Sequence, residues 1–164
     1  MKKYFYMLIG LPGSGKSTWV KENIFDTRVK IFSTDNLIEE AAKRAGLTYN
    51  EVFEDNIEEA TKTFFNGIRD AVAKGEDILV DRTNLSKKSR KKILDMIPDD
   101  YTKVAVLVKC DNLFLHEHRL MNRPGKNIPS NVIDNMRRTF EEPSIKEGFS
   151  SITLVNSAQH LEEV

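Results

Sequence analysis

The sequence predicts a single α/β domain, residues 1–164, in which a parallel sheet of four to five strands carries helices on both faces. Three observations lead to this prediction. The 164 residues, 40% of them hydrophobic, suit one domain with a core of its own. Apolar runs of strand length alternate with longer segments of helical period. A glycine-rich loop follows the first apolar run, at the edge where such sheets bind their ligands.

The first elements are two strands and two helices in alternation. Tyr4–Ile9 is an apolar run with the length of a buried strand, and the glycine-rich loop after it leads into a helix from about Lys16 to Asn23. Val29–Phe32 is long enough for a short second strand. Asp35–Ala45 has helical character and stops at Gly46, a residue type that often ends helices.

A long helix fills the middle of the chain. Thr48 and Glu51 form the T-x-x-E pattern of a capping box, which marks its start, and Gly75 marks its end. Apolar residues recur along it at spacings of three and four, the period of one buried face: Phe53, Ile57, Ala60, Phe64, Ile68 and Ala71. Asp77–Val80 is then expected to form a third strand.

The C-terminal half continues the alternation. The expected helices are Ser86–Ile97 and Leu113–Met121, and the expected strands are Val104–Val108 and Ile152–Val155. Asn122–Ile128 contains a proline and a glycine and is expected to be a loop. Pro129 can then occupy the first turn of a helix that runs to about Glu141.

The glycine-rich loop matches the pattern G-x-x-x-x-G-K-[ST] at every fixed position, between an expected strand and an expected helix. Glycines let the chain bend so that backbone N–H groups approach phosphate oxygens, and the helix adds the positive end of its dipole. Lys16 is expected to reach the β- and γ-phosphates, and the Ser17 hydroxyl to hold Mg²⁺. The residues expected to bind ATP are Gly10, Pro12, Gly13, Ser14, Gly15, Lys16, Ser17 and Thr18.

Composition limits the kinds of partner that the chain can bind and the cellular compartment in which it is expected. Lysine and arginine together number 25, as do aspartate and glutamate, so no overall charge draws the chain onto nucleic acid or membrane. A nucleic acid would have to be held by a local patch. The single cysteine, Cys110, excludes an intramolecular disulfide and favours a reducing compartment. No stretch approaches the roughly 20 apolar residues of a membrane span. We therefore expect a soluble, cytoplasmic protein with no membrane partner, while the oligomeric state stays open.

Asp35 follows the second expected strand, which places a carboxylate at the top of the sheet beside the phosphate-binding loop. Transfer of a phosphoryl group to a hydroxyl needs such a carboxylate to orient the acceptor and to take its proton. The structural alternative is that Asp35 caps the helix that follows, a task for which Ser33 and Thr34 are also suited.

The end of the third expected strand carries a second polar group, Asp81-Arg82-Thr83-Asn84. Asp81 is placed to hold the water shell of the metal ion, as the Walker-B aspartate does in other phosphate-loop proteins. Thr83 and Asn84 are expected to donate hydrogen bonds near the acceptor. The alternative is an ordinary strand-exit turn, in which Asp and Asn are common.

Two arginines, Arg119 and Arg123, accompany the Asn122–Ile128 loop. A loop with proline and glycine between two helices suits a lid over the triphosphate. An arginine on such a lid can stabilise the charge spread over the transferring phosphoryl group. We expect both arginines to contact the nucleotide and Arg123 to act in catalysis; the alternative for each is a solvated surface position.

Together these segments resemble the kinase domain of bacteriophage polynucleotide 5′-hydroxyl kinase, within the P-loop kinases of nucleic-acid repair. The resemblance covers nearly the whole chain and rests on Gly10–Thr18, Ser33-Thr34-Asp35, Asp81–Leu85, Arg119–Arg123 and Ile128-Pro129. It implies a P-loop kinase three-layer fold with an arginine-bearing lid. It also implies ATP with Mg²⁺, a 5′-hydroxyl end of DNA or RNA as substrate, and catalysis by Asp35 as general base with Lys16 and Arg123.

One position departs from that family. An arginine usually stands three residues after the base aspartate and grips the phosphate beside the 5′-hydroxyl, whereas this chain has Ile38. Arg82 is placed to reach the same region from the neighbouring strand. The basic run Lys87–Lys92 either contacts nucleic-acid phosphates or forms a solvated helix face. Two other functions stay open: a kinase of a nucleoside or another metabolite, and a nucleotide-dependent switch without an acceptor.

Overall fold

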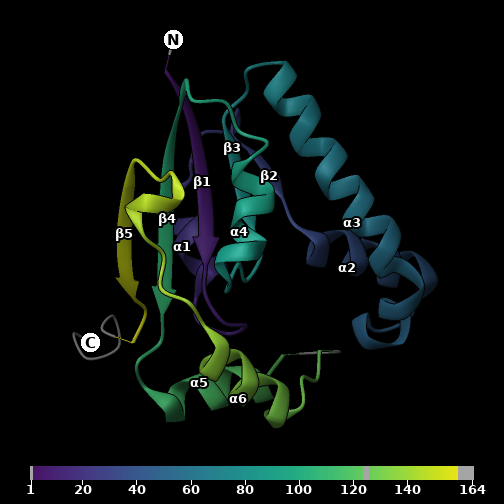
Figure 1. Cartoon of the computed structure of the whole chain (residues 1–164). Helices are drawn as coiled ribbons and strands as arrows, with labels where there is room; N and C mark the ends of the chain where they lie inside the picture. The colour runs from purple at the N-terminus through teal and green to yellow at the C-terminus, as the bar shows by residue number, and fades with distance from the viewer. Residues whose placement is uncertain (1, 124–125, 159–164) are drawn as a thin grey trace.

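The computed structural model describes residues 2–123 and 126–158. Within them, five strands form one sheet in the order β2-β3-β1-β4-β5, and every pairing is parallel (Figure 1). The strands are β1 (Lys3–Ile9), β2 (Lys30–Phe32), β3 (Ile78–Asp81), β4 (Tyr101–Lys109) and β5 (Ser151–Asn156). This confirms the predicted fold class.

The helices begin and end close to their expected positions. They are α1 (Lys16–Asn23), α2 (Thr34–Ala45), α3 (Tyr49–Ala73), α4 (Lys87–Leu94), α5 (Leu113–Met121) and α6 (Ser130–Thr139), with a short 3-10 helix η1 (Ile145–Glu147) before β5. The helix expected to run to Ile97 ends at Leu94, and the helix expected to run to Glu141 stops before Phe140, whose backbone is extended. None of the helices in the described part of the chain is both long and apolar enough to cross a membrane.

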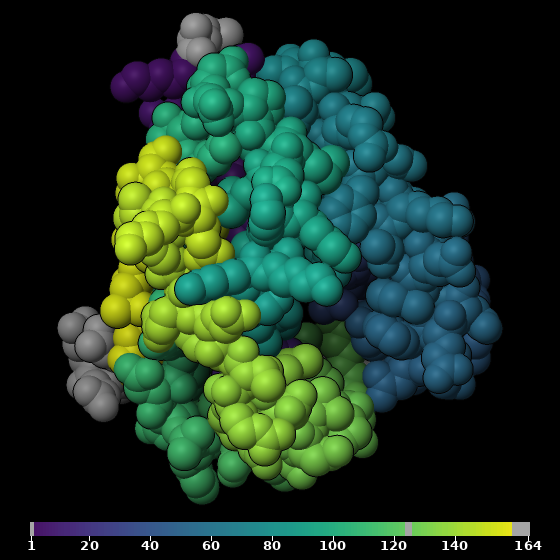
Figure 2. All heavy atoms as spheres, in the orientation of Figure 1, coloured from purple at the N-terminus to yellow at the C-terminus, as the bar shows by residue number. Residues whose placement is uncertain are grey.

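Helices cover both faces of the sheet. On one face, Phe64 of α3 and Ile93 of α4 belong to the same buried cluster as Met7 of β1. Figure 2 shows α3, α4 and the segment after α6 covering this face. On the other face, Trp19 of α1 packs against the cluster that contains Leu8. Successive residues of β1 point to opposite faces, so a strand covered on both sides has the continuous apolar sequence from which it was predicted.

A smaller apolar cluster joins α2 to the N-terminal half of α3. Its buried members are Ile38, Ala42, Val52 and Ala60. The capping box at the start of α3 is present as expected: Glu51 Oε1 accepts from the backbone N–H of Thr48 at 3.0 Å, and Thr48 Oγ1 accepts from that of Glu51. Packing and cap together fix the start of α3 beside the start of α2.

The pair α5 and α6 lies beyond the carboxyl ends of β1 and β4, where a lid was expected (Figure 1). The segment between these helices reaches across to α2 and α3. Lys126 forms an ion pair with Glu39, and Asn50 Nδ2 donates to the backbone oxygen of Asn127 at 3.2 Å. Pro124 and Gly125 of the expected lid loop lie outside the described residues.

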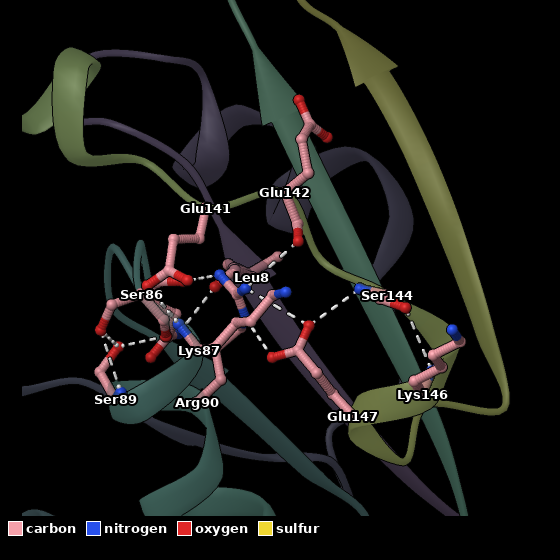
Figure 3. A network of polar contacts seen from close by, with 11 residues as sticks. Leu8, Ser86, Lys87, Ser89, Arg90, Glu141, Glu142, Ser144, Lys146 and Glu147 are labelled. Atoms are coloured by element: carbon pink, nitrogen blue, oxygen red, sulfur yellow. Dashed lines mark hydrogen bonds and ion pairs between the residues drawn. The ribbon is translucent and has the colours of Figure 1, made fainter.

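The basic run Lys87–Lys92 does not form one continuous charged surface. Arg90, in the middle of it, is 0% exposed, and its Nε lies 2.9 Å from Oε1 of Glu147 (Figure 3). The guanidinium also donates to the backbone oxygens of Asn84 and Glu142, at 2.9 and 3.5 Å. Arg90 therefore holds α4 to the segment before β5 and is not available to a phosphate, while the four lysines of the run remain exposed.

Candidate active site

A pocket of about 440 Å³ lies at the carboxyl ends of β1 and β3. The phosphate-binding loop, the start of α2, the turn after β3 and the α5–α6 segment all contribute to it. Its lining includes Pro12, Gly13, Gly15, Lys16, Ser17, Thr18, Asp35, Glu39, Asp81, Arg82, Thr83, Arg119, Arg123 and Lys126. The structure thus brings most of the expected site residues together. Gly10 and Ser14 line a separate cavity behind the loop, and Asn84 lines neither.

The loop has the sharp bend that phosphate binding requires. Gly13 and Gly15 have φ angles of 75° and 109°, in the left-handed region that other residues rarely adopt. A Cβ on Gly15 would lie 2.8 Å from the Cβ of Ser157, so the packing also requires glycine there. Because α1 begins at Lys16, directly after this bend, its unpaired N–H groups and the positive end of its dipole lie at the pocket.

Side chains from other elements bind the carbonyl oxygens of the loop. Nε2 of His116 lies 2.6 Å from the Pro12 oxygen. Arg119 Nη1 donates to the Ser14 oxygen at 3.4 Å, and the hydroxyl of Ser157 donates to the same oxygen. The sequence singled out neither His116 nor Ser157, because both contacts join residues more than a hundred positions apart.

Lys16 is a partly buried cation whose Nζ donates to the backbone oxygens of Gly10, at 2.7 Å, and Leu11, at 3.0 Å. Burial lowers the pKa of Lys16 to about 8, although the carboxylates of Asp81 and Asp35 oppose this shift. Burial makes the charged ammonium costly, and its present partners are neutral carbonyl oxygens. The negative charge of a bound phosphate would therefore strongly stabilise the protonated form of Lys16.

Asp35 lies in the first turn of α2 and does not cap it. The cap is Ser33, whose Oγ accepts from the backbone N–H of Asn36 at 3.2 Å. Asp35 Oδ1 instead accepts a 2.6 Å hydrogen bond from the hydroxyl of Tyr49, the first residue of α3. Burial and this hydrogen bond raise the pKa of Tyr49, so the phenol stays protonated and remains a donor. The capping alternative for Asp35 is therefore wrong.

Asp81 and Ser17 are the residues in the pocket that suit a magnesium ion. Burial raises the pKa of Asp81, an effect that the charge of Lys16 opposes, so this carboxylate is stabilised by a nearby cation. Across the described residues, no group of three or more His, Cys, Asp or Glu side chains could hold a metal ion. One carboxylate and one hydroxyl fit a Mg²⁺ ion that arrives with the phosphate oxygens and keeps several waters.

The two lid arginines both line the pocket but make different contacts. Arg123 lines the pocket, and its buried Nη1 has no hydrogen-bond partner among the described residues. A buried guanidinium nitrogen without an acceptor is costly, and a phosphate oxygen would satisfy it. Arg119 already donates to the backbone oxygen of Ser14 and to the hydroxyl of Ser157, at 3.4 and 2.8 Å, and so braces the loop.

Arg82 and Thr83 reach the pocket, but Asn84 does not. The Arg82 guanidinium lies 4.9 Å from the centroid of the Phe64 ring, which fixes its orientation. Asn84 is 4% exposed, and its Nδ2 donates to the backbone oxygen of Leu8 at 2.7 Å. The expectation that Asn84 donates to the acceptor is wrong, because its left-handed backbone, with φ of 49°, turns the side chain back beneath β1.

Three residues that the sequence did not single out lie at or beside the pocket: Glu39 and Lys126 line it, and Tyr49 donates to Asp35. Lys126 forms the ion pair with Glu39, and its Nζ lies 4.8 Å from the centroid of the Tyr49 ring. The only sequence signal that could have pointed to any of these three residues was the position of Lys126 within the expected lid loop, Asn122–Ile128. Ile38, where the resemblance led us to expect an arginine, is fully buried between α2 and α3 and contributes nothing to the pocket.

A bent glycine loop between β1 and α1, with a lysine at its end and carboxylates after β2 and β3, defines a P-loop nucleotide-binding protein with the α/β fold of P-loop kinases. The pattern of the AAA domain family matches residues 5–143. The chain belongs to this family.

Comparison with individual proteins gives the same fold. The L-seryl-tRNA(Sec) kinase of Methanococcus maripaludis is 28% identical over 144 residues, which cover 85% of this chain and 53% of that protein. The chain therefore spans about half the length of this curated relative. A candidate kinase from Chloroflexus aurantiacus superposes with a TM-score of 0.70 at 15% identity, covering 99% of this chain and 97% of the other. A chain of the Pnkp1/Rnl/Hen1 RNA repair complex gives 0.64 at 19% identity, covering 84% and 44%.

Proposed function

We propose that this protein is an ATP-dependent kinase that transfers the γ-phosphate of ATP to a hydroxyl group. One arrangement carries the proposal: the carboxylate of Asp35 lines the same pocket as Lys16 of the phosphate-binding loop and Arg123 of the lid. Binding a nucleotide does not need such a carboxylate, whereas accepting the proton of a hydroxyl nucleophile does. A nucleotide switch without an acceptor would have no use for it.

The proposed place of the nucleoside is a second hollow, which continues from the loop along α1. It measures about 590 Å³ and is lined in part by Trp19, Arg119, Val155 and Ser157. Arg119 lines both hollows, so it stands where the nucleoside and the phosphates of one ATP molecule would meet.

In the proposed reaction, an oxygen of the acceptor attacks the γ-phosphorus while the bond to the bridging oxygen breaks and ADP leaves. Asp35 orients the acceptor hydroxyl with Oδ2, because Tyr49 occupies Oδ1, and it takes up the proton. Lys16 and Arg123 bind the phosphoryl oxygens on which charge accumulates. Mg²⁺, when bound, neutralises phosphate charge, and Ser17 and Asp81 are the residues that would hold it.

We propose the 5′-hydroxyl end of DNA or RNA as the acceptor, and nucleic-acid repair as the setting. A nucleic-acid end carries a phosphate beside the reacting hydroxyl, and Arg82 supplies a cation on this side of the pocket, where Ile38 does not. The likeness to a chain of an RNA repair complex and to a kinase that acts on a seryl-tRNA agrees with a nucleic-acid substrate.

A kinase of a nucleoside or another small metabolite is the second candidate, and one observation favours it. The contacts of Lys126 with Glu39 and Tyr49 close the acceptor side of the pocket with protein, which would enclose a small acceptor. The lid would have to open for a polynucleotide to enter.

Transfer of label from [γ-³²P]ATP separates these candidates. With Mg²⁺ and 5′-hydroxyl DNA and RNA oligonucleotides, we expect label at the 5′ end. Arg82→Gln should raise the KM for the oligonucleotide, but not for ATP. If compounds in a metabolite mixture were labelled but oligonucleotides were not, the protein would be a kinase of a small metabolite and not of a nucleic-acid end. ATP turnover that no added hydroxyl compound stimulates would contradict both.

A further inference from the structure

His116 joins the phosphate-binding loop to both lid helices. It lies on α5 and is 2% exposed. One ring nitrogen, Nε2, lies 2.6 Å from the backbone oxygen of Pro12. The other, Nδ1, lies 2.7 Å from Nη2 of Arg137 on α6, and Arg137 also pairs with Asp134 on the same helix. The imidazole thus bridges two groups that have opposite hydrogen-bonding requirements.

These two partners fix the protonation of the ring. A guanidinium can only donate, so Nδ1 must accept and carries no proton. A carbonyl oxygen can only accept, so Nε2 must carry the proton and donate it. His116 is therefore neutral, in the Nε2–H tautomer, and Arg137 determines which tautomer is present.

The bond to Pro12 also orients the peptide that follows it. In a trans peptide the carbonyl and the next N–H point in opposite directions, and no cis peptide is present among the described residues. His116 lines the cavity behind the loop, whereas Gly13 lines the phosphate pocket in front. Holding the Pro12 oxygen toward His116 therefore directs the Gly13 N–H toward the pocket.

We infer that His116 is a positioning residue of the ATP site: as the Nε2–H tautomer selected by Arg137, it sets the Pro12–Gly13 peptide so that the Gly13 N–H faces the phosphates. This inference rests on the proposed binding of ATP by the loop. It gives the lid a second role, because α5 and α6 each supply one of the two residues that hold the loop in its binding conformation.

The surroundings of the ring also oppose its protonation. Burial lowers the pKa of His116, and the cations Arg137, Arg119 and Lys16 lower it further, while the bond to Pro12 acts in the opposite direction. Asp134 is the carboxylate that pairs with Arg137, and it binds Nη1 of that guanidinium, whereas the ring binds Nη2. A proton on Nδ1 would face Arg137 and break this contact, and the lowered pKa means that this happens at a more acid pH than 6.5, the ordinary pKa of histidine.

Two matched variants test the role of the hydrogen bonds. His116→Gln supplies an amide N–H for Pro12 and an amide oxygen for Arg137, whereas His116→Leu fills similar space and supplies neither. ATP affinity can be followed by the fluorescence of Trp19, the single tryptophan, on α1 directly after the loop. We expect H116L to weaken ATP binding about tenfold and H116Q to stay within about threefold of the unchanged protein.

Acid pH separates positioning from simple packing. Below the lowered pKa of His116, the unchanged protein should lose ATP affinity relative to H116Q at the same pH, a comparison that cancels the titration of ATP itself. Equal ATP affinity of H116L and the unchanged protein would overturn the inference alone, as would an H116Q variant as weak as H116L. Failure of the unchanged protein to bind ATP would overturn the proposed function as well.

A measurement on the unchanged protein covers the case in which H116L does not fold. Long-range ¹⁵N–¹H spectra of the histidine rings report the tautomer directly, without any activity assay. We expect His116 to carry its proton on Nε2 at pH 7. A proton on Nδ1, or on both nitrogens, would contradict the inference.

Discussion

The hydroxyl of Tyr49 donates a 2.6 Å hydrogen bond to Oδ1 of Asp35, and through it the first residue of α3 holds a carboxylate at the start of α2. Asp35 lines the phosphate pocket, on the side proposed for the acceptor. In the proposed reaction, the bond to Tyr49 leaves Oδ2 of Asp35 for the acceptor hydroxyl. Two helices that pack through a small apolar cluster thus position one functional group.

Tyr49→Phe removes this hydrogen bond and leaves the ring in place. A hydrogen bond to a charged group contributes about 1.5–3 kcal/mol, so we expect kcat/KM for the acceptor to fall about tenfold or more. The Kd for ATP should be unchanged, because Tyr49 lies on the acceptor side. An equal loss in ATP affinity and in acceptor turnover would indicate a general structural effect instead.

The pKa of Lys16 predicts how ATP binding depends on pH. In the free protein burial lowers this pKa to about 8, and the negative charge of bound phosphate raises it. ATP therefore binds preferentially to the protonated lysine. Between neutral pH, where His116 is uncharged, and about pH 8, ATP affinity should be level; above pH 8 it should fall by up to about tenfold per pH unit. The Lys16→Met variant should bind more weakly and show no such dependence, and an unchanged protein with level affinity up to pH 10 would refute the assignment.

Arg123→Met tests the buried guanidinium nitrogen that has no partner among the described residues. If it stabilises charge on the transferring phosphoryl group, its loss should lower kcat about a hundredfold, with a smaller effect on the Kd for ATP. Arg119→Met is the comparison, since Arg119 braces the loop through Ser14 and Ser157. It should act mainly on ATP affinity. If Arg119→Met instead lowered kcat and Arg123→Met mainly weakened ATP binding, Arg119 would be the catalytic arginine and Arg123 the one that braces the loop.

Glu147→Leu tests whether Arg90 is structural. Removing its carboxylate leaves a charge buried at 0% exposure without an ionic partner, which should destabilise the fold by about 3–5 kcal/mol in denaturant unfolding. The double variant Arg90→Met/Glu147→Leu should recover much of this loss, because it buries apolar groups instead. Neither variant should change the KM for an oligonucleotide under conditions in which it is folded. A raised KM for the oligonucleotide without a loss of stability would instead indicate that Arg90 contacts the substrate.

The local elements were predictable because their signals are local. The apolar run of β1, the capping box of Thr48 and Glu51, and the phosphate-loop pattern each lie within a few neighbouring residues. Parallel strands also end at one edge of a sheet, so Asp35 and Asp81 could be expected to meet from their places after two strands.

The long-range contacts of the site and of the fold were not predictable, because they join distant parts of the chain. His116 and Pro12 are 104 positions apart, and Arg90 and Glu147 are 57 apart. No short pattern encodes such pairs. Asn84 shows the related limit within a motif. Its position just after β3 is predictable, but the left-handed backbone that accompanies the turn of its side chain toward Leu8 has no signature in the sequence.

The most direct test of the account is single-turnover phosphoryl transfer by Asp35→Asn, which keeps the shape of the side chain but removes its ability to take up a proton. With ATP binding measured separately by Trp19 fluorescence, we predict an unchanged Kd for ATP and a loss of transfer to the hydroxyl acceptor of about a hundredfold or more. Transfer at the rate of the unchanged protein would contradict the central claim that Asp35 is the general base.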